Sequence, residues 1–396
     1  MRRKFPLKFL LVLVLAVLVL GAGASYLQPI PSVRPVLVAK EKQSGEAVDL
    51  PWPAYGQAAI GASGHGVLQT YGEQKAAPIA SIAKVITALA VLEKKPLPLD
   101  DEGQPITIGT TDVQLFEDYF AIGGSVVKVQ NGEQISQYEA LQGMLLPSGN
   151  NMADSLARWA FGSVEAYTEY ANKMVSSMGL SKTKVADASG FSPNTVSSPE
   201  DLVRLGERVM ATPVLAEIVG QKTAIIPVAG EISNVNWLLG QDGVVGIKTG
   251  NTDEAGGCFL FASNQTVDGE QVTVIGAVLS APTRNQAIED SRVLAVAAAS
   301  KFERRVLIAD GEVIGQYTAP WGASAQAVAK EDLSAVVWKA SSATTDIKLK
   351  PVSGGSEAGH AEVGAVTVTL GSKKASQVAV LSKPLAGPSW TWRIFH

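Results

Sequence analysis

The sequence predicts an α+β fold, in which an antiparallel sheet carries packed helices, followed by a small all-β domain. The first observation is the order of the segments. Strand-like residues 54–71 precede a run of helical segments, and strand-like residues 244–248, 258–262 and 272–280 follow it. The second is that residues 304–396 contain only short strand-like runs separated by Gly, Ser and Pro. The third is the 46% hydrophobic content of the 396 residues, which argues against disorder and suffices for a substantial core.

The helices are predicted from residue spacing and from their start signals. Apolar residues recur every three or four positions over residues 81–94, which predicts a helix there. Ser198 and Pro199, followed by two acids, are typical of a helix start, and that helix is predicted to reach Met210. The remaining helical segments are residues 138–146, 152–159, 164–178 and 283–302.

Short strands are predicted throughout the C-terminal domain. Its strand-like runs are residues 306–308, 313–317, 335–337, 344–349, 365–370 and 377–381. At the very end of the chain Trp390, Trp392 and Ile394 alternate with polar residues, which favours one more strand.

The N-terminus is predicted to be an export segment. Its charge is +4, from Arg2, Arg3, Lys4 and Lys8. Because the net charge of the whole chain is −4, the rest of the chain carries a net charge of −8. The uncharged aliphatic run after these cations is intermediate in length between a signal-peptide core and a membrane-spanning helix. Residues 22–24 offer a small-x-small cleavage pattern. Residues 1–27 are therefore a signal peptide or a membrane anchor, with the anchor favoured, and the remainder is expected outside the cytoplasm.

The domain boundaries follow from composition. Residues 28–51 are rich in proline and are predicted to be a tether. Residues 52–303 form the larger predicted domain, and residues 304–396 form the C-terminal β-domain.

Composition also excludes several classes of function. An acidic body argues against nucleic-acid binding, which needs a basic face. The single cysteine, Cys258, excludes an internal disulfide and a cysteine-rich metal site, and it is interpreted as a small buried hydrophobic residue. His65, His360 and His396 are too scattered to suggest a zinc hydrolase, so we expect no metal and no cofactor.

The first candidate motif is Ser81-Ile82-Ala83-Lys84. Residues three apart share one face of a helix, so the amine of Lys84 would lie beside the hydroxyl of Ser81. A serine becomes a good nucleophile when a neighbouring base accepts its proton, and burial can make lysine that base. Residues 181–184 match the same spacing, but their polar surroundings indicate an exposed turn.

The second motif is Ser148-Gly149-Asn150, between two predicted helices. Its hydroxyl could relay a proton and its amide could orient a substrate, although serine and asparagine are also common helix caps.

The third motif is Lys248-Thr249-Gly250 at the end of a predicted strand, where a cation and a hydroxyl could bind a carboxylate. We expect Gly250 to let a substrate backbone lie close to the strand. A phosphate loop is excluded, because Ile247 stands where that motif needs glycine.

The order of the three motifs resembles the serine-type D-alanyl-D-alanine carboxypeptidases, the low-molecular-weight penicillin-binding proteins of peptidase family S11. Residues 77–89, residues 236–250 and the segment Asp187-Ala188-Ser189-Gly190-Phe191 are also similar to that family. The likeness extends over residues 52–302 and implies a β-lactamase/transpeptidase-like fold for the catalytic domain.

The resemblance implies a role for each motif residue. Ser81 would attack the bond between two terminal D-alanines of a peptidoglycan stem peptide, and Lys84 would take its proton. Ser148 would help to deliver a proton to the leaving D-alanine, while Asn150 would hold the hydrogen-bond network of these side chains in place.

Lys248 and Thr249 would bind the substrate's free carboxylate, and Gly250 would lie beside the substrate backbone. The backbone N–H groups of Ser81 and Asn251 would bind the oxyanion. Lys248 is also expected to lower the pKa of Lys84 by like-charge repulsion.

The family resemblance implies β-lactam antibiotics as inhibitors, and it leaves alternatives open. A β-lactamase has the same chemistry, but Asn150 completes a Ser-Gly-Asn that lacks the Asp usual in the class A form of this motif. Endopeptidase action on cross-links is a second alternative, and a non-catalytic cell-wall-binding protein is a third. Asn251, directly after the third motif, departs from the family pattern and could alter substrate preference.

Overall fold

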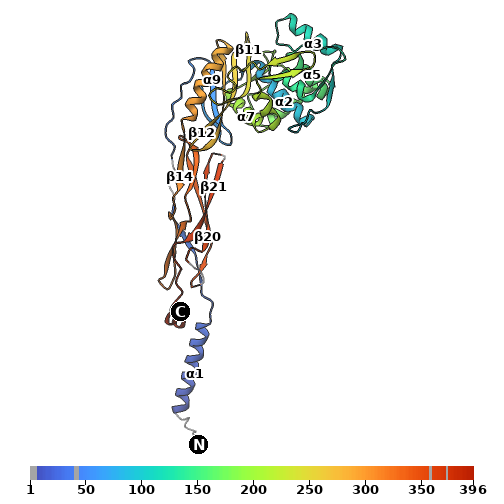
Figure 1. Cartoon of the computed structure of the whole chain (residues 1–396). Helices are drawn as coiled ribbons and strands as arrows, with labels where there is room; N and C mark the ends of the chain where they lie inside the picture. The colour runs from blue at the N-terminus through green and yellow to red at the C-terminus, as the bar shows by residue number, and fades with distance from the viewer. Residues whose placement is uncertain (1–6, 40–43, 356–358, 372) are drawn as a thin grey trace. The chain divides into compact units, whose positions relative to one another are not determined.

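The computed structural model describes residues 7–39, 44–355, 359–371 and 373–396. Arg2, Arg3 and Lys4 of the predicted export segment lie outside these ranges. The chain forms two compact units (Figure 1). One is residues 47–303, and the other combines residues 1–46 with residues 304–396.

A five-stranded antiparallel sheet forms the centre of the 47–303 unit. Its strand order is β11-β12-β13-β3-β4, so β11 is an edge strand of the described sheet. The strand-like segment predicted over residues 54–71 forms a hairpin of β3 and β4. A tight turn at Asp268 and Gly269 joins β12 to β13. The bounds are β3 (Gln57–Ala62), β4 (Gly66–Tyr71), β11 (Val244–Thr252), β12 (Gly256–Val267) and β13 (Glu270–Ala281).

Helices cover both faces of this sheet. Figure 1 shows α9 on one side of the sheet and α2, α5 and α7 on the other. Residues 83–92 of α2 are all buried, which makes it the central helix of the unit. The bounds are η1 (Ala80–Ile82), α2 (Ala83–Lys94), α3 (Thr110–Ala121), α4 (Gln137–Leu145), α5 (Asn150–Phe161), α6 (Val164–Ser177), α7 (Pro199–Met210), α8 (Pro213–Gly220) and α9 (Arg284–Ala299).

The helix predictions are confirmed with small shifts at the ends. The segment predicted over 283–302 ends at Ala299, because Phe302 begins the next strand. Helices α3 and α8 were not predicted. Three small two-stranded pairs complete the unit: β5 (Ala77–Pro78) with β8 (Val196–Ser197), β6 (Pro105–Thr107) with β7 (Gln134–Ser136), and β9 (Thr223–Ile226) with β10 (Gly230–Ser233).

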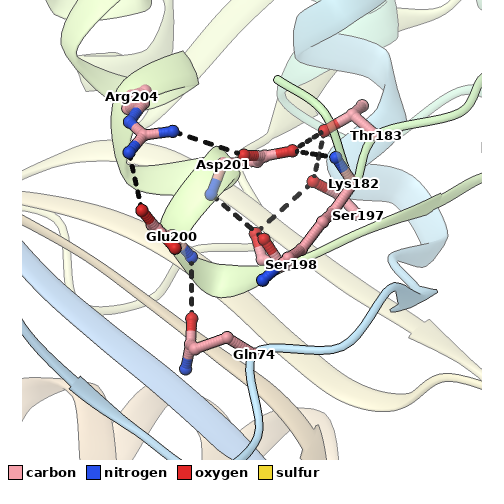
Figure 2. Close-up of polar contacts among 8 residues, drawn as sticks. All are labelled: Gln74, Lys182, Thr183, Ser197, Ser198, Glu200, Asp201 and Arg204. Carbon is pink, nitrogen blue, oxygen red and sulfur yellow. Dashed lines mark hydrogen bonds and ion pairs between the residues drawn. The ribbon is translucent and has the colours of Figure 1, made fainter. Parts of the chain in front are cut away.

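The start of α7 is held by a buried polar network (Figure 2). Ser198 caps the helix by accepting a hydrogen bond from the Asp201 N–H at 3.3 Å, as the sequence predicted. Asp201, only 2% exposed, accepts from the Lys182 N–H at 2.8 Å and from the Thr183 hydroxyl at 2.9 Å. This network therefore holds the turn that carries the second Ser-x-x-Lys match, and Lys184 is exposed there as expected.

The second unit is built mainly from strands of the C-terminal domain. Its six-stranded sheet has the order β18-β20-β21-β16-β15-β2, and β14 pairs with β17. The bounds are β14 (Phe302–Ile308), β15 (Val313–Thr318), β16 (Ser324–Ala329), β17 (Leu333–Trp338), β18 (Ala343–Leu349), β19 (Val352–Ser353), β20 (Glu362–Leu370) and β21 (Lys373–Leu381).

The segment predicted as a tether contributes to this second unit. β1 (Ser32–Val33) pairs with β19, and β2 (Pro35–Leu37) pairs with β15. Part of residues 28–51 is therefore ordered by hydrogen bonding to distant strands, which its proline content alone did not indicate.

The chain end predicted as a strand is a helix instead, α10 (Trp390–Phe395). Ser389 caps it by accepting a hydrogen bond from the Trp392 N–H at 3.2 Å. Trp392 stacks on His396, four residues later, with ring centroids 4.9 Å apart. This spacing requires a helical turn, so the alternation of aromatic residues was misleading.

The export segment forms α1 (Leu7–Tyr26). Within it, 19 residues have a mean hydropathy of 2.5, and none of its most apolar stretch is buried in the protein. By length and composition this helix can span a membrane, and a signal sequence has the same character.

Candidate active site

Ser81 lies in the 3₁₀ turn η1, directly before the buried helix α2. Ala80 has a positive φ of 45°. Two glycines from distant segments pack against this turn. A Cβ atom on Gly190 would lie 1.9 Å from the Ala80 carbonyl oxygen, and one on Gly250 would lie 2.8 Å from the Ile79 carbonyl oxygen. A side chain at position 250 would therefore collide with the nucleophile turn, and the role of Gly250 toward a substrate backbone stays a prediction.

Lys84 is fully buried, and its amine is surrounded by three acceptors. Nζ lies 2.9 Å from Ser81 Oγ, 2.7 Å from Asn150 Oδ1 and 2.8 Å from the Ser189 carbonyl oxygen. Burial lowers the pKa of Lys84 to about 7, although the carboxylates of Asp187 and Asp154 oppose the shift. The amine is therefore substantially neutral at neutral pH.

The partners of Lys84 fix the direction of its lone pair. A neutral amine has two N–H donors and one lone pair. The carbonyl oxygens of Asn150 and Ser189 can only accept, so they take the two donors. Ser81 is the remaining partner and can donate through its hydroxyl. The lone pair therefore points at the serine proton, which is the arrangement of a nucleophile and its general base.

The second motif lies in the short loop between α4 and α5. Ser148 has a positive φ of 69° and is 5% exposed, and Asn150 begins α5. Asn150 donates its backbone N–H to the Ser125 carbonyl oxygen at 2.8 Å. Lys248 donates to the Ser148 hydroxyl at 3.1 Å. The loop thus connects the two lysines of the site, one through Asn150 and the other through Ser148.

The third motif lies on β11, the edge strand. Lys248 and Thr249 are buried, while Asn251 is exposed. Lys248 also donates to the Thr249 carbonyl oxygen at 3.0 Å. The pKa of Lys248 is lowered well below its usual value, first by burial and then by the positive charges of Lys84 and Arg284. Burial is the main reason for the lowered pKa of both lysines, and repulsion between the two amines adds to it at Lys248.

A polar network beyond the three motifs was not predicted as part of the site. Tyr119 donates to Asp154 at 2.9 Å, and its oxygen lies 3.4 Å from Ser189 Oγ. Ser189 in turn donates to Asp187 at 2.9 Å. The Asp187–Phe191 segment resembled the family, but nothing assigned it a contact with Lys84. Asp154 lies four residues after Asn150, a helical spacing that could have placed both residues on one face of α5.

Other residues singled out in the sequence lie outside this site. Burial raises the pKa of the Cys258 thiol to about 11, in agreement with its interpretation as a small buried hydrophobic residue. His65 packs edge-on against Phe302. Over the described residues, no group of three or more His, Cys, Asp and Glu side chains is placed to hold a metal ion.

Comparison with protein families gives a match over most of the 47–303 unit. The profile of peptidase family S11, described as D-alanyl-D-alanine carboxypeptidase, matches residues 57–283. A D-alanyl-D-alanine endopeptidase of Pseudomonas aeruginosa is 30% identical over 251 residues, which cover 60% of this chain and 78% of that protein. The D-alanyl-D-alanine carboxypeptidase DacF of Bacillus subtilis is 26% identical over 213 residues, covering 52% of each chain.

Comparison with solved structures gives the same fold. Penicillin-binding protein 5 from Haemophilus influenzae aligns with a TM-score of 0.62 at 22% identity, covering 86% of this chain and 100% of that one. The Streptomyces K15 DD-transpeptidase is 26% identical, with a TM-score of 0.56 over 63% of this chain and 99% of that one. The β-lactamase/transpeptidase-like fold expected from the motifs is confirmed.

Proposed function

Because the chain belongs to the D-alanyl-D-alanine carboxypeptidase family, peptidase S11, and is a serine-type peptidase, we propose that Ser81 is the nucleophile that removes the terminal D-alanine from peptidoglycan stem peptides. The observation that carries this proposal is the direction of the Lys84 lone pair. Both N–H donors of the neutral amine are taken by carbonyl oxygens, so Ser81 is left to supply the proton.

Acylation then proceeds in two steps. Ser81 Oγ attacks the carbonyl carbon between the two D-alanines as its proton moves to Lys84, and a tetrahedral oxyanion forms. The backbone N–H groups of Ser81 and Asn251 face that oxyanion. The C–N bond then breaks, and the proton that Lys84 took from Ser81 passes to the leaving amine by way of Ser148, which hydrogen-bonds to Lys248. Lys84 is then neutral again and can accept a proton from water. Water attacks the resulting ester, which releases the shortened peptide and restores the Ser81 hydroxyl.

Lys248 and Thr249 bind the free carboxylate of the substrate. The Lys248 amine donates to Ser148 Oγ and to the Thr249 carbonyl oxygen. A bound carboxylate favours the ammonium form of Lys248, which has a third N–H donor for that carboxylate. Because β11 is an edge strand, its backbone can also receive an extended peptide. A β-lactam offers a carboxylate beside a reactive carbonyl, so the same residues account for acylation by these inhibitors.

Endopeptidase activity is the second candidate function. The relative that is 30% identical is named an endopeptidase, as are similar proteins from Escherichia coli and Haemophilus influenzae at 27% and 28% identity. An endopeptidase cleaves the same kind of bond in a cross-link between two stem peptides, so the chemistry at Ser81 does not distinguish the two activities.

The site of action is proposed to be extracytoplasmic. The apolar helix α1 tethers the protein to the membrane or directs its secretion, and peptidoglycan lies on the outer side of that membrane.

Mass spectrometry of two purified substrates tests these proposals. One is a stem pentapeptide ending in D-Ala-D-Ala, and the other is a cross-linked dimer of stem peptides. We expect D-alanine release from the pentapeptide by wild type and none by Ser81→Ala. Ser181→Ala is the matched control from the second Ser-x-x-Lys match, and it should retain full activity. Cleavage of the dimer alone would replace the carboxypeptidase assignment with the endopeptidase one.

Covalent labelling with a fluorescent penicillin tests the nucleophile itself. Wild type and Ser181→Ala should be labelled, and Ser81→Ala should not. Equal labelling of Ser81→Ala would exclude Ser81 as the nucleophile, and rapid turnover of the penicillin would indicate a β-lactamase.

A further inference from the structure

We propose that Asp154 and Tyr119 are positioning residues that hold Lys84 and set the pH range in which it accepts the Ser81 proton. The proposal rests on the proposed function, because it concerns the general base of the same site. Neither residue belongs to the three sequence motifs. Asp154 lies on α5, the helix that begins with Asn150, and Tyr119 lies on α3, which packs against α5.

Asp154 is placed next to the base by the geometry of α5. It follows Asn150 by four residues, so both project from the same face of the helix. Asn150 accepts a hydrogen bond from Lys84 at 2.7 Å. One turn later stands the carboxyl group of Asp154, which is only 8% exposed. A carboxylate in that position acts on the Lys84 amine through a poorly solvated region.

Tyr119 connects Asp154 to the other side of the same amine. Its hydroxyl donates to Asp154 Oδ2 at 2.9 Å and lies 3.4 Å from Ser189 Oγ. The carbonyl oxygen of Ser189 accepts a hydrogen bond from Lys84 at 2.8 Å. Two of the three groups that hold the Lys84 amine, Asn150 and Ser189, are thus neighbours of the Asp154–Tyr119 pair.

The charges of this region are mixed, and they come from several elements. Burial raises the pKa of Asp154 to about 6, so its carboxylate is charged at neutral pH. That charge favours the ammonium form of Lys84, whereas burial of the lysine favours the neutral form. The titratable and charged groups that act on Asp154 or lie beside it are Lys84 on α2, Tyr119 and Asp112 on α3, Arg158 on α5, Tyr167 on α6, and Asp187.

The carboxylate of Asp187 raises the pKa of Lys84, as that of Asp154 does. Asp187 also stabilises the turn in which it lies. Its carboxylate accepts hydrogen bonds from Ser189 Oγ and from the backbone N–H groups of Phe191 and Ser192. Substitution of Asp187 would therefore disturb the turn that carries the Ser189 carbonyl. Asp154 has Tyr119 as its hydrogen-bonding partner and can be changed to the isosteric asparagine.

The test is the pH dependence of acylation by a fluorescent penicillin. With a neutral residue at position 154, Lys84 loses a stabilising negative charge and stays unprotonated at lower pH. We expect the acid-side midpoint of the Asp154→Asn profile to move down by about 0.5–1 pH unit, so that its relative rate below neutral pH exceeds that of wild type.

Tyr119→Phe should move the midpoint in the same direction. Without the tyrosine donor the pKa of Asp154 rises further, so less negative charge faces Lys84 near neutral pH. The double variant Asp154→Asn/Tyr119→Phe should show no larger shift than Asp154→Asn alone, because the tyrosine acts through the carboxylate.

Asp112→Asn is the matched control. Asp112 on α3 accepts a hydrogen bond at 2.6 Å from Ser155, the residue that follows Asp154 on α5. It is therefore a carboxylate at the same contact between the two helices. Its profile should keep the wild-type midpoint. An unchanged midpoint in Asp154→Asn, or an equal shift in Asp112→Asn, would overturn the proposal, as would an equal loss of rate at every pH.

NMR titration of lysine labelled with ¹³C at Cε provides a readout that does not depend on catalysis. The Lys84 resonance should titrate at lower pH in Asp154→Asn than in wild type. Absence of acylation in wild type would refute the proposed function, while this titration would still decide the role of Asp154.

Discussion

Gly190 lies so close to the Ala80 carbonyl oxygen that a Cβ atom at this position would stand 1.9 Å from it. Gly190 follows Ser189, whose carbonyl oxygen holds the Lys84 amine, and Ala80 precedes Ser81. One glycine therefore sets the distance between the segment that holds the base and the turn that carries the nucleophile.

Gly190→Ala should displace the Ser81 turn and reduce acylation. A displacement of about 1 Å at a reacting group can cost on the order of 100-fold in rate, and we expect a loss of that size in penicillin labelling. Gly179→Ala is the control, because Gly179 has the same φ of 74° but open space around its Cβ position. It should lose about 1 kcal/mol of stability without a large change in acylation. Labelling of Gly190→Ala at the wild-type rate would show that the turn tolerates the displacement.

Acylation of wild type should depend on the neutral form of Lys84. Because burial lowers the pKa of Lys84 to about 7, the rate should be half-maximal near that pH and should fall as the pH decreases. The measurement is the rate of penicillin labelling across a pH series, with circular dichroism to verify that the protein remains folded. A rate that stays constant well below the pKa of the amine would contradict Lys84 as the base.

Lys248→Ala should weaken selectively the binding of substrates that carry a free carboxylate. We expect kcat/KM for a pentapeptide with a free C-terminus to drop by about 10–100-fold, which corresponds to the loss of a charged hydrogen bond. A pentapeptide with an amidated C-terminus should be affected much less. Lys222→Ala, at an exposed lysine, should leave both values unchanged. An equal decrease for both peptides would assign Lys248 a structural role instead.

The network at the start of α7 should contribute to stability in a graded manner. Ser198→Ala removes the helix cap and should cost about 1 kcal/mol in urea unfolding. Asp201→Ala leaves the buried donors of Lys182 and Thr183 without an acceptor, so it should cost about 2–3 kcal/mol or more. Arg204→Ala, at a side chain that is 42% exposed, should cost less than about 0.5 kcal/mol. A loss for Arg204→Ala as large as for Asp201→Ala would indicate that the ion pair, not the buried hydrogen bonds, holds the turn.

The local parts of the site could be predicted from the sequence, and the long-range parts could not. Ser81 and Lys84 are three residues apart, so helical geometry alone brings them together. Tyr119 reaches Asp154 from another helix, and no periodic pattern shows that contact. The packing of Gly250 against the nucleophile turn was missed for the same reason, since the atoms that require a glycine there belong to residues far away in the chain.

The errors in the fold come from segments too short to give a reliable pattern. β1 and β2 contain two and three residues, and hydrogen bonds from strands distant in the sequence hold them in place. At the C-terminus, alternation of Trp390, Trp392 and Ile394 over five residues fits a strand, but the Ser389 cap and the stacking of Trp392 on His396 favour a helical turn.

The pairing of β1 and β2 also determines the order in which the protein is completed. The chain is synthesised from its N-terminus, so Ser32 and its neighbours emerge before any residue of the 47–303 unit. Their partners, Ser353 on β19 and Gly315 on β15, emerge only after that unit is complete. The peptidase unit can therefore fold first, while the first-made strands remain unpaired until β15 and β19 have been synthesised. A chain truncated after residue 303 would keep all three motifs and lose the partners of its own N-terminal strands.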